Sequence, residues 1–148
     1  MLMEQCRSYV AEAKPLVNEP TIVNAVMAPL MNGQLQEHFY IILLNTKNKM
    51  IDAPILVHKG TLNSCPVMPT DVFRPAISKG ARAIILVHNH PSGDPTPSSE
   101  DLTLTTKLMQ GGTLLGINIM DHVILGAATP TSPSYYSLRE KGLLSFGG

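Results

Sequence analysis

Apolar residues gather in several uninterrupted runs along the chain, and these runs predict its β-strands. Residues 39–44 and 82–87 are almost entirely apolar, which is typical of strands buried on both faces. Residues 50–57 follow the first run after a short polar turn, so the two runs are expected to form a hairpin. Residues 114–119 and 122–125 are expected to form two further strands.

Spaced apolar positions and turn-forming residues predict the helices. Thr70 is expected to cap one of them, Gly80 follows its end, and Pro75 removes one backbone donor inside it. The pair Gly111-Gly112 is expected to stop another helix. The predicted helices span residues 3–14, 21–31, 70–79 and 98–110, with a further short helix within 135–146. The order of these helices and strands indicates an α/β (α+β) domain in which helices pack against a mixed sheet.

Length and composition are those of one folded domain. A chain of 148 residues is expected to bury about two thirds of its unfolded surface, which provides a core without disulfides. With 44% hydrophobic and only 15% charged residues, the composition excludes a disordered chain. The formal net charge is zero and no segment carries a basic stripe, so DNA or RNA is possible as a ligand but not favoured.

The cysteines and the first residues bear on the compartment. Cys6 and Cys65 lie far apart and form neither a CxxC pair nor a disulfide framework, which suits a reducing environment. Residues 1–14 carry charges where a secretory signal needs an apolar stretch. No apolar run reaches the length of about 18 residues that a membrane span needs. A cytoplasmic location is therefore expected.

Two histidines follow directly on the strand predicted at residues 82–87. His88 and His90 are two positions apart, so in a strand both imidazoles lie on one face and can reach one metal ion. Residues 91–97 then turn the chain sharply, and Asp101 in the first turn of the next helix can reach back as a third ligand. Three protein ligands leave a fourth position for water, which is typical of a catalytic zinc site, so Zn²⁺ is the expected cofactor.

Glu37 and Ser98 are the candidate catalytic residues beside this metal site. Glu37 precedes the strand at residues 39–44, and pairing of that strand with residues 82–87 would bring it to the same edge of the sheet. There its carboxylate could take the proton of the attacking water and return it to a leaving amine. Ser98 could donate a hydrogen bond to the oxyanion that develops.

Each fragment of this pattern also has a purely structural interpretation. A His-x-His spacing recurs by chance, and a glutamate before a strand is most often only solvated. Ser98-x-x-Asp101 alone is typical of a helix capping box, in which the serine is the N-cap. Ser98 can fill both roles at once. The combination of these fragments is what indicates a site.

The pattern gives less support for a functional role of the other histidines and of one cysteine. His38 would alternate away from Glu37 and is expected to be packed or exposed, and His58 is expected to lie in a loop at a strand end. His122 either orients a metal ligand or is a satisfied structural histidine. Cys65 has no assignable base and is not favoured as a nucleophile.

The arrangement His88-x-His90, seven residues, Ser98-x-x-Asp101, with an upstream glutamate at Glu37, resembles the JAMM motif of the MPN/JAB metalloprotease superfamily. The segments that resemble its RadC branch are residues 36–39, 60–63, 88–101 and 121–126. The resemblance implies a single MPN/JAB-like domain over residues 21–126. Residues 1–20 would then be an N-terminal extension and residues 127–148 the C-terminal tail of the same domain.

The resemblance also implies the roles of these residues. The two histidines and the aspartate would ligate zinc, Glu37 would be the general base, and Ser98 would support the oxyanion. Relatives of this kind cut peptide or isopeptide bonds, which implies a zinc metallopeptidase-like hydrolase acting on a peptide or a protein conjugate. The resemblance leaves the particular substrate and the oligomeric state open.

Two other functions stay open beside this one, a non-catalytic MPN scaffold and a DNA-repair-associated protein of RadC type. The presence of all the ligands counts against a scaffold. RadC proteins commonly carry an N-terminal helix-hairpin-helix module, for which this chain is too short, and often have Arg-Glu where Thr70-Asp71 stands. The missing module and the neutral charge count against a DNA role. A zinc deaminase is excluded because its His-x-Glu and Pro-Cys-x-x-Cys pattern is absent.

Overall fold

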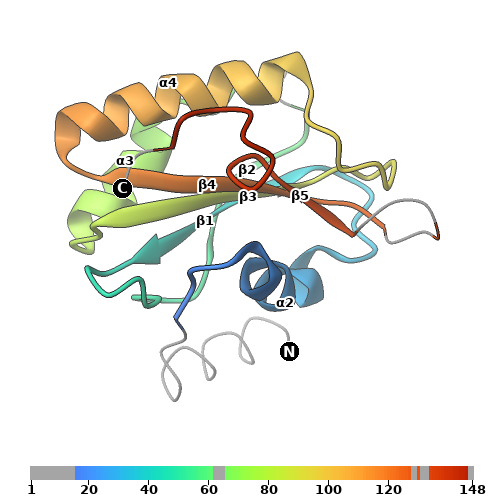
Figure 1. Ribbon diagram of the computed structural model, residues 1–148, viewed down its shortest axis with the longest axis horizontal. Coiled ribbons are helices and arrows are strands. Elements are labelled where there is room, and N and C mark those ends of the chain that lie inside the picture. The colour runs from blue at the N-terminus through green and yellow to red at the C-terminus, as the bar shows by residue number, and fades with distance from the viewer. Residues whose placement is uncertain (1–15, 62–65, 128–129, 131–133, 147–148) are drawn as a thin grey trace.

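A five-stranded mixed sheet runs through the centre of the computed structural model, which describes residues 16–61, 66–127, 130 and 134–146 (Figure 1). The strands are β1 (His38–Leu44), β2 (Ile55–Lys59), β3 (Ala83–Asn89), β4 (Asn118–Leu125) and β5 (Tyr135–Ser137). They are arranged in the order β2-β1-β3-β4-β5. Only the central pair, β3 and β4, is parallel, and the other pairs are antiparallel. The mixed sheet predicted from the sequence is confirmed.

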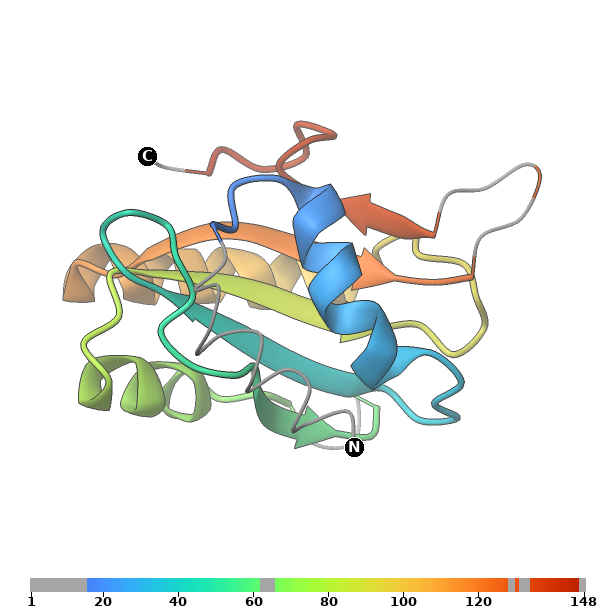
Figure 2. The same cartoon turned by 90° about the horizontal axis from the view of Figure 1, so that it is seen from below.

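Helices cover both faces of this sheet. The helices of the described residues are α2 (Pro20–Met31), α3 (Pro69–Ser78) and α4 (Ser99–Leu115). Helix α2 lies on one face, and α3 and α4 lie on the other (Figures 1 and 2). Each face has its own cluster of buried apolar side chains, one including residues of α2 and the other residues of α3 and α4. None of the described helices is both long and apolar enough to cross a membrane.

The strands β1 and β3 are buried along their whole length, as their continuous apolar runs predict. Successive side chains of β1 belong to the two clusters in turn. Tyr40 and Ile42 pack toward α2, whereas Phe39 and Ile41 pack toward α3 and α4. In the antiparallel register of β1 and β3, Phe39 stands opposite His88. This pairing brings the start of β1 to the edge of the sheet at which β3 ends.

The helix α4 does not stop at Gly111-Gly112, so this part of the prediction is wrong. It continues to Leu115 and ends at Gly116, which has the left-handed φ of 72°. A Cβ on Gly111 would lie 3.0 Å from the ring of Phe73, and one on Gly112 would lie 2.3 Å from the carbonyl oxygen of Ile117. The two glycines therefore allow close packing of the helix and do not terminate it.

The two strands predicted at residues 114–119 and 122–125 are wrong in number and extent. Residues 118–125 form the single strand β4, and residues 114–115 belong to helix α4. Asp121 lies inside β4, where its carboxylate accepts hydrogen bonds from Ser137 Oγ (2.5 Å) and from the backbone N–H of Arg139 (3.0 Å). A polar residue is accommodated within the strand because the neighbouring chain supplies donors.

The short helix expected within residues 135–146 is absent from that described segment, which instead begins with strand β5. The backbone N–H of Gly126 donates to Ser134 O (2.8 Å), and that of Leu138 donates to His122 O (3.0 Å). These bonds add β5 to the open edge of β4. Local sequence does not reveal such pairing, because the partner lies on another strand.

The predicted strand at residues 50–57 is displaced along the chain. Met50 forms only an isolated bridge to Leu44, and the regular pairing with β1 begins at Ile55. In between the chain bends, and the carboxylate of Asp52 accepts a hydrogen bond from the N–H of Ala53 (2.8 Å). The antiparallel pairing of β1 and β2 is nevertheless confirmed.

The cap predicted for α3 is also wrong by two positions. Met68, not Thr70, is the N-cap, and its backbone N–H donates to the carboxylate of Asp71 (3.0 Å). Pro75 lies inside the helix. The helix expected at residues 3–14 lies outside the described residues, as do both cysteines.

Candidate metal centre

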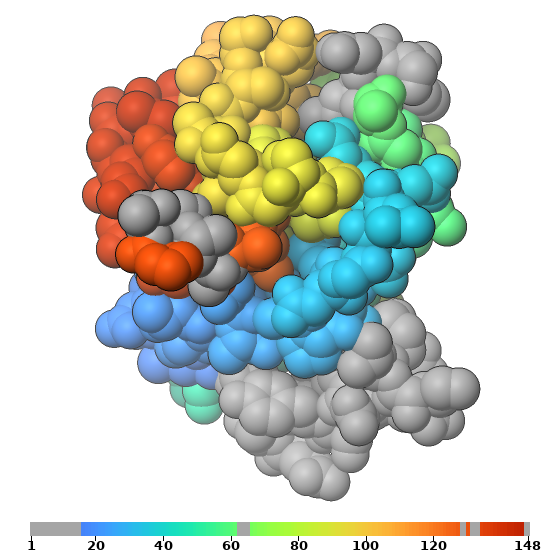
Figure 3. All heavy atoms as spheres, turned by 90° about the vertical axis from the view of Figure 1, so that its right-hand side faces the viewer, coloured from blue at the N-terminus to red at the C-terminus, as the bar shows by residue number. Residues whose placement is uncertain are grey.

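The structure brings His88, His90 and Asp101 together at the end of β3. His88 Nε2 lies 3.0 Å from His90 Nε2 and 3.2 Å from Asp101 Oδ1, and His90 Nε2 lies 3.1 Å from Asp101 Oδ2. Figure 3 shows this end of the molecule, where the loop after β3 (yellow) adjoins the segment after α2 (cyan). The sharp turn at residues 91–97 places the first turn of α4 beside the strand that precedes it, as predicted.

The three groups form a donor set that could hold a metal ion. A tetrahedral site with metal–ligand bonds of the length typical of zinc needs ligand atoms about 3.3 Å apart, close to the spacing found here. His90 Nδ1 lies 2.9 Å from the carbonyl oxygen of Asp94, which can only accept. The proton of a neutral His90 therefore sits on Nδ1, and its Nε2 presents a lone pair to the other two groups.

The first turn of α4 fixes the carboxylate of Asp101. The backbone N–H of Ser98 donates to Asp101 Oδ2 (2.9 Å), and the backbone N–H of Asp101 donates to Ser98 Oγ (3.1 Å). This reciprocal pair is the capping box predicted from the sequence, and Ser98 is the N-cap. The capping role and a metal-ligating role of Asp101 are therefore compatible, because the bonds that cap the helix also orient the carboxylate.

The charges of the site favour an ionised carboxylate. Burial raises the pKa of Asp101, but its close contacts with the imidazoles of His88 and His90 outweigh burial and hold this pKa well below its usual range. Burial lowers the pKa of His90, yet the Asp101 carboxylate, the Asp94 carbonyl and the charge of Glu37 together raise it above its ordinary value. The raised pKa of His90 and the low pKa of Asp101 both favour an imidazolium beside a carboxylate in the metal-free protein, and a cation can take the place of that proton.

Glu37 lies beside this centre, at the edge where β1 begins. The register of β1 and β3 places it there, as predicted, and its charge contributes to the raised pKa of His90. Its side chain is half-buried. The carboxylate is therefore near the metal centre without being one of the three converging groups.

Asn89 holds the segment that carries Glu37, a role that the sequence did not reveal. Asn89 Oδ1 accepts from the backbone N–H of His38 (2.7 Å), and its Nδ2 donates to Gln36 O (3.1 Å). These two bonds fix the backbone of the residues on both sides of Glu37. One feature of the sequence could have indicated this role: Asn89 stands between two candidate ligands at a strand end, and a carboxamide can both donate to and accept from the backbone of a neighbouring segment.

His122 is packed behind His88, on the side away from His90. The His122 ring is fully buried, and its Nε2 lies 2.7 Å from His88 Nδ1. Burial lowers the pKa of His122 well below its ordinary value, so this ring is neutral. Phe39 stacks on His88 with a centroid distance of 5.7 Å. Both neighbours restrict the orientation of the His88 ring.

The remaining histidines lie apart from this group. His38 is buried, and its Nδ1 lies 2.9 Å from the carbonyl oxygen of Gln36. His58 belongs to strand β2 and not to a loop, which corrects the prediction. Neither ring joins the three converging groups.

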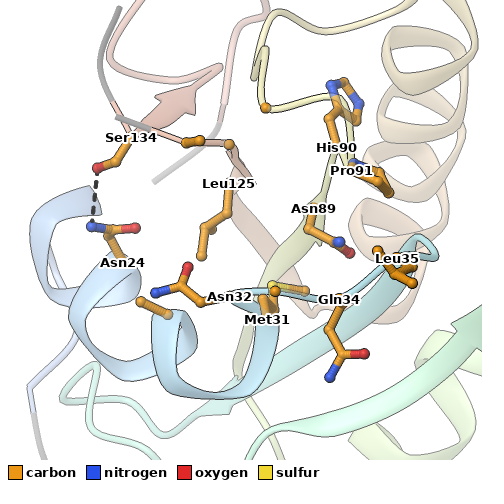
Figure 4. A pocket seen from close by; sticks show the side chains of 15 residues that line it. Asn24, Met31, Asn32, Gln34, Leu35, Asn89, His90, Pro91, Leu125 and Ser134 are labelled. Carbon is orange, nitrogen blue, oxygen red and sulfur yellow. Dashed lines mark hydrogen bonds between the residues drawn. The ribbon is translucent and has the colours of Figure 1, made fainter. Parts of the chain in front are cut away.

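A cleft of about 530 Å³ opens beside His90, between the end of α2 and the loops after β3 and β4. Figure 4 shows His90 and Pro91 on one side of it, and Asn24 and Ser134 on the other. Its described lining includes four carboxamide side chains and no lysine, arginine, aspartate or glutamate. The cleft thus offers neutral hydrogen-bonding groups next to the metal centre.

Residues 17–143 match the family model of the RadC-like JAB domain. A UPF0758 protein of Methanosarcina mazei is 40% identical over 143 residues, 97% of this chain and 60% of the relative. UPF0758 proteins of Symbiobacterium thermophilum and Staphylococcus epidermidis are each 45% identical, over 91% and 84% of this chain and 57% and 55% of their own lengths. The chain therefore spans somewhat more than half the length of these curated relatives.

Proposed function

Because this chain belongs to the RadC-like JAB domain family, we propose that it is a zinc-dependent hydrolase that cleaves a peptide or isopeptide amide bond. The observation that carries the proposal is the convergence of His88, His90 and Asp101 at the mutual spacing of zinc ligands. Two imidazoles and one carboxylate would hold the ion and leave a position for water. When bound, zinc supplies Lewis-acid activation of the water and of the substrate carbonyl.

Glu37 is the general base of the proposed reaction. Its carboxylate takes a proton from the attacking water and passes it to the nitrogen of the leaving amine. The position near His90 suits this role, because the carboxylate lies close enough for its charge to raise the pKa of His90 and is only half-buried. Asn89 restricts the backbone on either side of Glu37 and so limits where the carboxylate can move.

Ser98 supports the oxyanion of the tetrahedral intermediate. Its Oγ accepts the backbone N–H of Asp101, so its own proton is not used in that bond. The hydroxyl proton can therefore be donated to a carbonyl oxygen that gains negative charge. Helix capping uses a lone pair of the Ser98 oxygen, whereas the proposed catalytic role uses its proton.

The neutral cleft beside His90 supports an amide substrate in preference to a phosphodiester. Carboxamide side chains can pair with both the N–H and the C=O groups of an extended peptide. A nucleic-acid backbone needs lysine or arginine, and neither occurs among the described residues that line the cleft. The formal net charge of zero points the same way.

The first test is the metal content of the purified protein by plasma mass spectrometry, on wild type and His90→Ala together. We expect one zinc per chain in the wild type and none in the variant, because the variant loses one of three ligands. Wild type without metal, even after zinc is offered, would contradict the hydrolase and leave a scaffold function.

The second test is hydrolysis by the zinc-loaded protein of internally quenched peptides and of a fluorogenic lysine-isopeptide substrate. Glu37→Gln is expected to keep its zinc and to lose about 10²–10⁴-fold in kcat, the contribution of a positioned general base. Full turnover in this variant would refute the role of Glu37. Cleavage of a plain phosphodiester and of no amide would favour the DNA-associated alternative.

A further inference from the structure

A chain of three hydrogen bonds runs from the backbone of α4 to His88 Nδ1, the ring nitrogen that faces away from His90 and Asp101. Thr105 Oγ1 lies 2.7 Å from the carbonyl oxygen of Asp101, and 2.5 Å from His122 Nδ1. His122 Nε2 in turn lies 2.7 Å from His88 Nδ1. Thr105, His122 and His88 are all buried, and at most 1% of the surface of each residue is exposed.

The direction of these bonds follows from counting protons. A threonine hydroxyl has one proton, and the Asp101 carbonyl can only accept, so the proton of Thr105 is used in that bond. The contact between Thr105 Oγ1 and His122 Nδ1 therefore needs its proton on the histidine. A neutral His122 protonated on Nδ1 has a lone pair on Nε2, which can only accept from His88.

The direction of these bonds determines which nitrogen of His88 carries the proton. His88 donates its Nδ1 proton to His122, so its Nε2 is unprotonated and presents a lone pair to His90 and Asp101. If the chain of bonds ran the other way, His88 Nε2 would carry a proton and could not bind a metal ion. The direction of one hydroxyl group in α4 thus decides whether His88 is a ligand.

We propose that Thr105 and His122 form a positioning relay that fixes the tautomer of His88 and keeps its Nε2 ready to ligate the metal ion. The proposal rests on the metal site of the proposed function and adds two residues to it. Neither residue touches the metal or the substrate. A partner behind a metal-ligating histidine sets its tautomer and raises its basicity, and the relay does so from a helix backbone.

The test compares Thr105→Ala with Thr105→Ser, two variants that both lose the methyl group and differ only in the hydroxyl. Thr106→Ala is the matched control, because Thr106 also donates to a carbonyl four residues earlier but lies on the exposed face of α4. Zinc affinity is measured by competition with a chromophoric chelator. Thr105→Ala is expected to bind zinc about 10–100-fold more weakly, whereas Thr105→Ser and Thr106→Ala stay within about threefold of wild type.

A second measurement determines the tautomers of His88 and His122 in the wild-type protein, without any mutation. Long-range ¹H–¹⁵N correlation spectra of the metal-free and zinc-loaded wild type distinguish protonated from unprotonated ring nitrogens. We expect the zinc-loaded protein to show His122 protonated on Nδ1 and His88 protonated on Nδ1. Protonation of His122 on Nε2 in the zinc-loaded protein would overturn the relay.

The outcomes separate this inference from the proposed function. A wild type that binds no zinc refutes the proposed metal site. A wild type that binds zinc, together with Thr105→Ala binding as tightly as Thr105→Ser, refutes the relay and leaves the metal site intact. Thermal unfolding of the metal-free variants identifies a general loss of structure, which would lower the melting temperature of Thr105→Ala in the absence of zinc.

Discussion

At the scale of single residues, backbone groups outside the metal centre hold its side chains. The carbonyl of Asp94 contacts His90 Nδ1, and the N–H of Ser98 contacts the carboxylate of Asp101. Such contacts restrict each side chain to one orientation before a metal ion arrives. A preformed site avoids the cost of ordering its ligands on binding, which is the condition for precise chemistry.

Asn89 provides a test of how far Glu37 depends on its support. Asn89→Ala removes the two hydrogen bonds that hold the backbone on both sides of Glu37. We expect kcat to fall on the order of 10²-fold, the effect of a small misplacement, while one zinc per chain is retained. The measurement is steady-state kinetics on the amide substrate together with metal content.

The control for Asn89 is Asn24→Ala, a second asparagine in the lining of the same cleft. Asn24 contacts Ser134 and not the segment of Glu37, so its loss should leave kcat nearly unchanged, and any effect on substrate binding in the cleft should appear in KM. Equal losses of kcat in the two variants would contradict a specific role for Asn89.

Zinc binding should release a proton from His90, and the affinity for zinc should therefore depend on pH. The pKa of His90 lies above the ordinary value of 6.5, so at pH 6.5 more than half of the metal-free protein carries a protonated His90. Protons compete with zinc below this pKa, so zinc affinity should rise with pH until the pKa is passed and then level off. Asp101 is already ionised, because its pKa is held low, and adds no proton.

Calorimetry checks this prediction by titrating zinc at pH 6.5 in two buffers of different ionisation enthalpy. The difference between the two apparent enthalpies gives the number of protons released, which should exceed one half per zinc. An affinity that does not change between pH 6 and pH 8 would contradict the pKa assigned to His90.

At the scale of elements, α4 links the metal centre to the core. Its first turn presents Asp101, and its next turn presents Thr105 to His122. Near its other end, Gly112 lies so close to the start of β4 that a Cβ would be 2.3 Å from Ile117 O. The two ends therefore fix how the helix lies along the sheet.

The paired glycines of α4 give a stability test with an internal control. Gly112→Ala places a methyl group against a backbone carbonyl that cannot withdraw freely, because the N–H of Ile117 also donates to Gly112 O (2.9 Å). We expect a loss of about 1–3 kcal/mol in the free energy of unfolding, as for other overpacked positions. Urea denaturation measures it.

Gly111→Ala is the matched control, since its Cβ would meet only the ring of Phe73, at 3.0 Å. A side chain can shift where a backbone cannot, and alanine gains about 1 kcal/mol over glycine in a helix. Gly111→Ala should therefore be close to neutral. A Gly112→Ala variant as stable as Gly111→Ala would show that the close approach is not a constraint.

At the scale of the whole molecule, the apolar core is expected to hold the fold together without a metal ion. Two apolar clusters pack the two faces of the sheet, and both extend well beyond the metal centre. The three groups that could hold a metal ion lie at the end of β3, at one edge of this core. The protein should therefore stay folded without metal, unlike small zinc domains that unfold when the ion is removed.

Removal of zinc should lower the melting temperature without unfolding the protein at 25 °C. A free zinc concentration of 100 times Kd stabilises the folded state by about 2.7 kcal/mol. For a domain of this size, each kcal/mol corresponds to a shift of about 2–4 °C. Thermal scans with zinc and with excess chelator measure the shift, and far-UV circular dichroism should match in both. His90→Ala should show no shift, and loss of secondary structure on chelation would contradict a metal-independent core.

Much of this fold and site could be predicted from local sequence. The continuous apolar runs identified β1 and β3, and the spacing of His88, His90 and Asp101 identified the converging groups. The failures share one cause. Local propensity predicts a helix stop at Gly111 and Gly112 and a short helix within residues 135–146, because it takes no account of the neighbouring elements that decide both.

The sequence by itself therefore determined the residue types that can bind a metal ion and the strand, loop and helix that carry them. It did so because short-range periodicity and spacing fix which side chains share a face. Only the tertiary structure decided that β5 pairs with β4. It also decided that Asn89 is hydrogen-bonded to the segment that carries Glu37. In the same way, it placed Thr105 and His122 behind His88. These contacts join residues from different elements, and their hydrogen bonds form only once packing has brought those elements together.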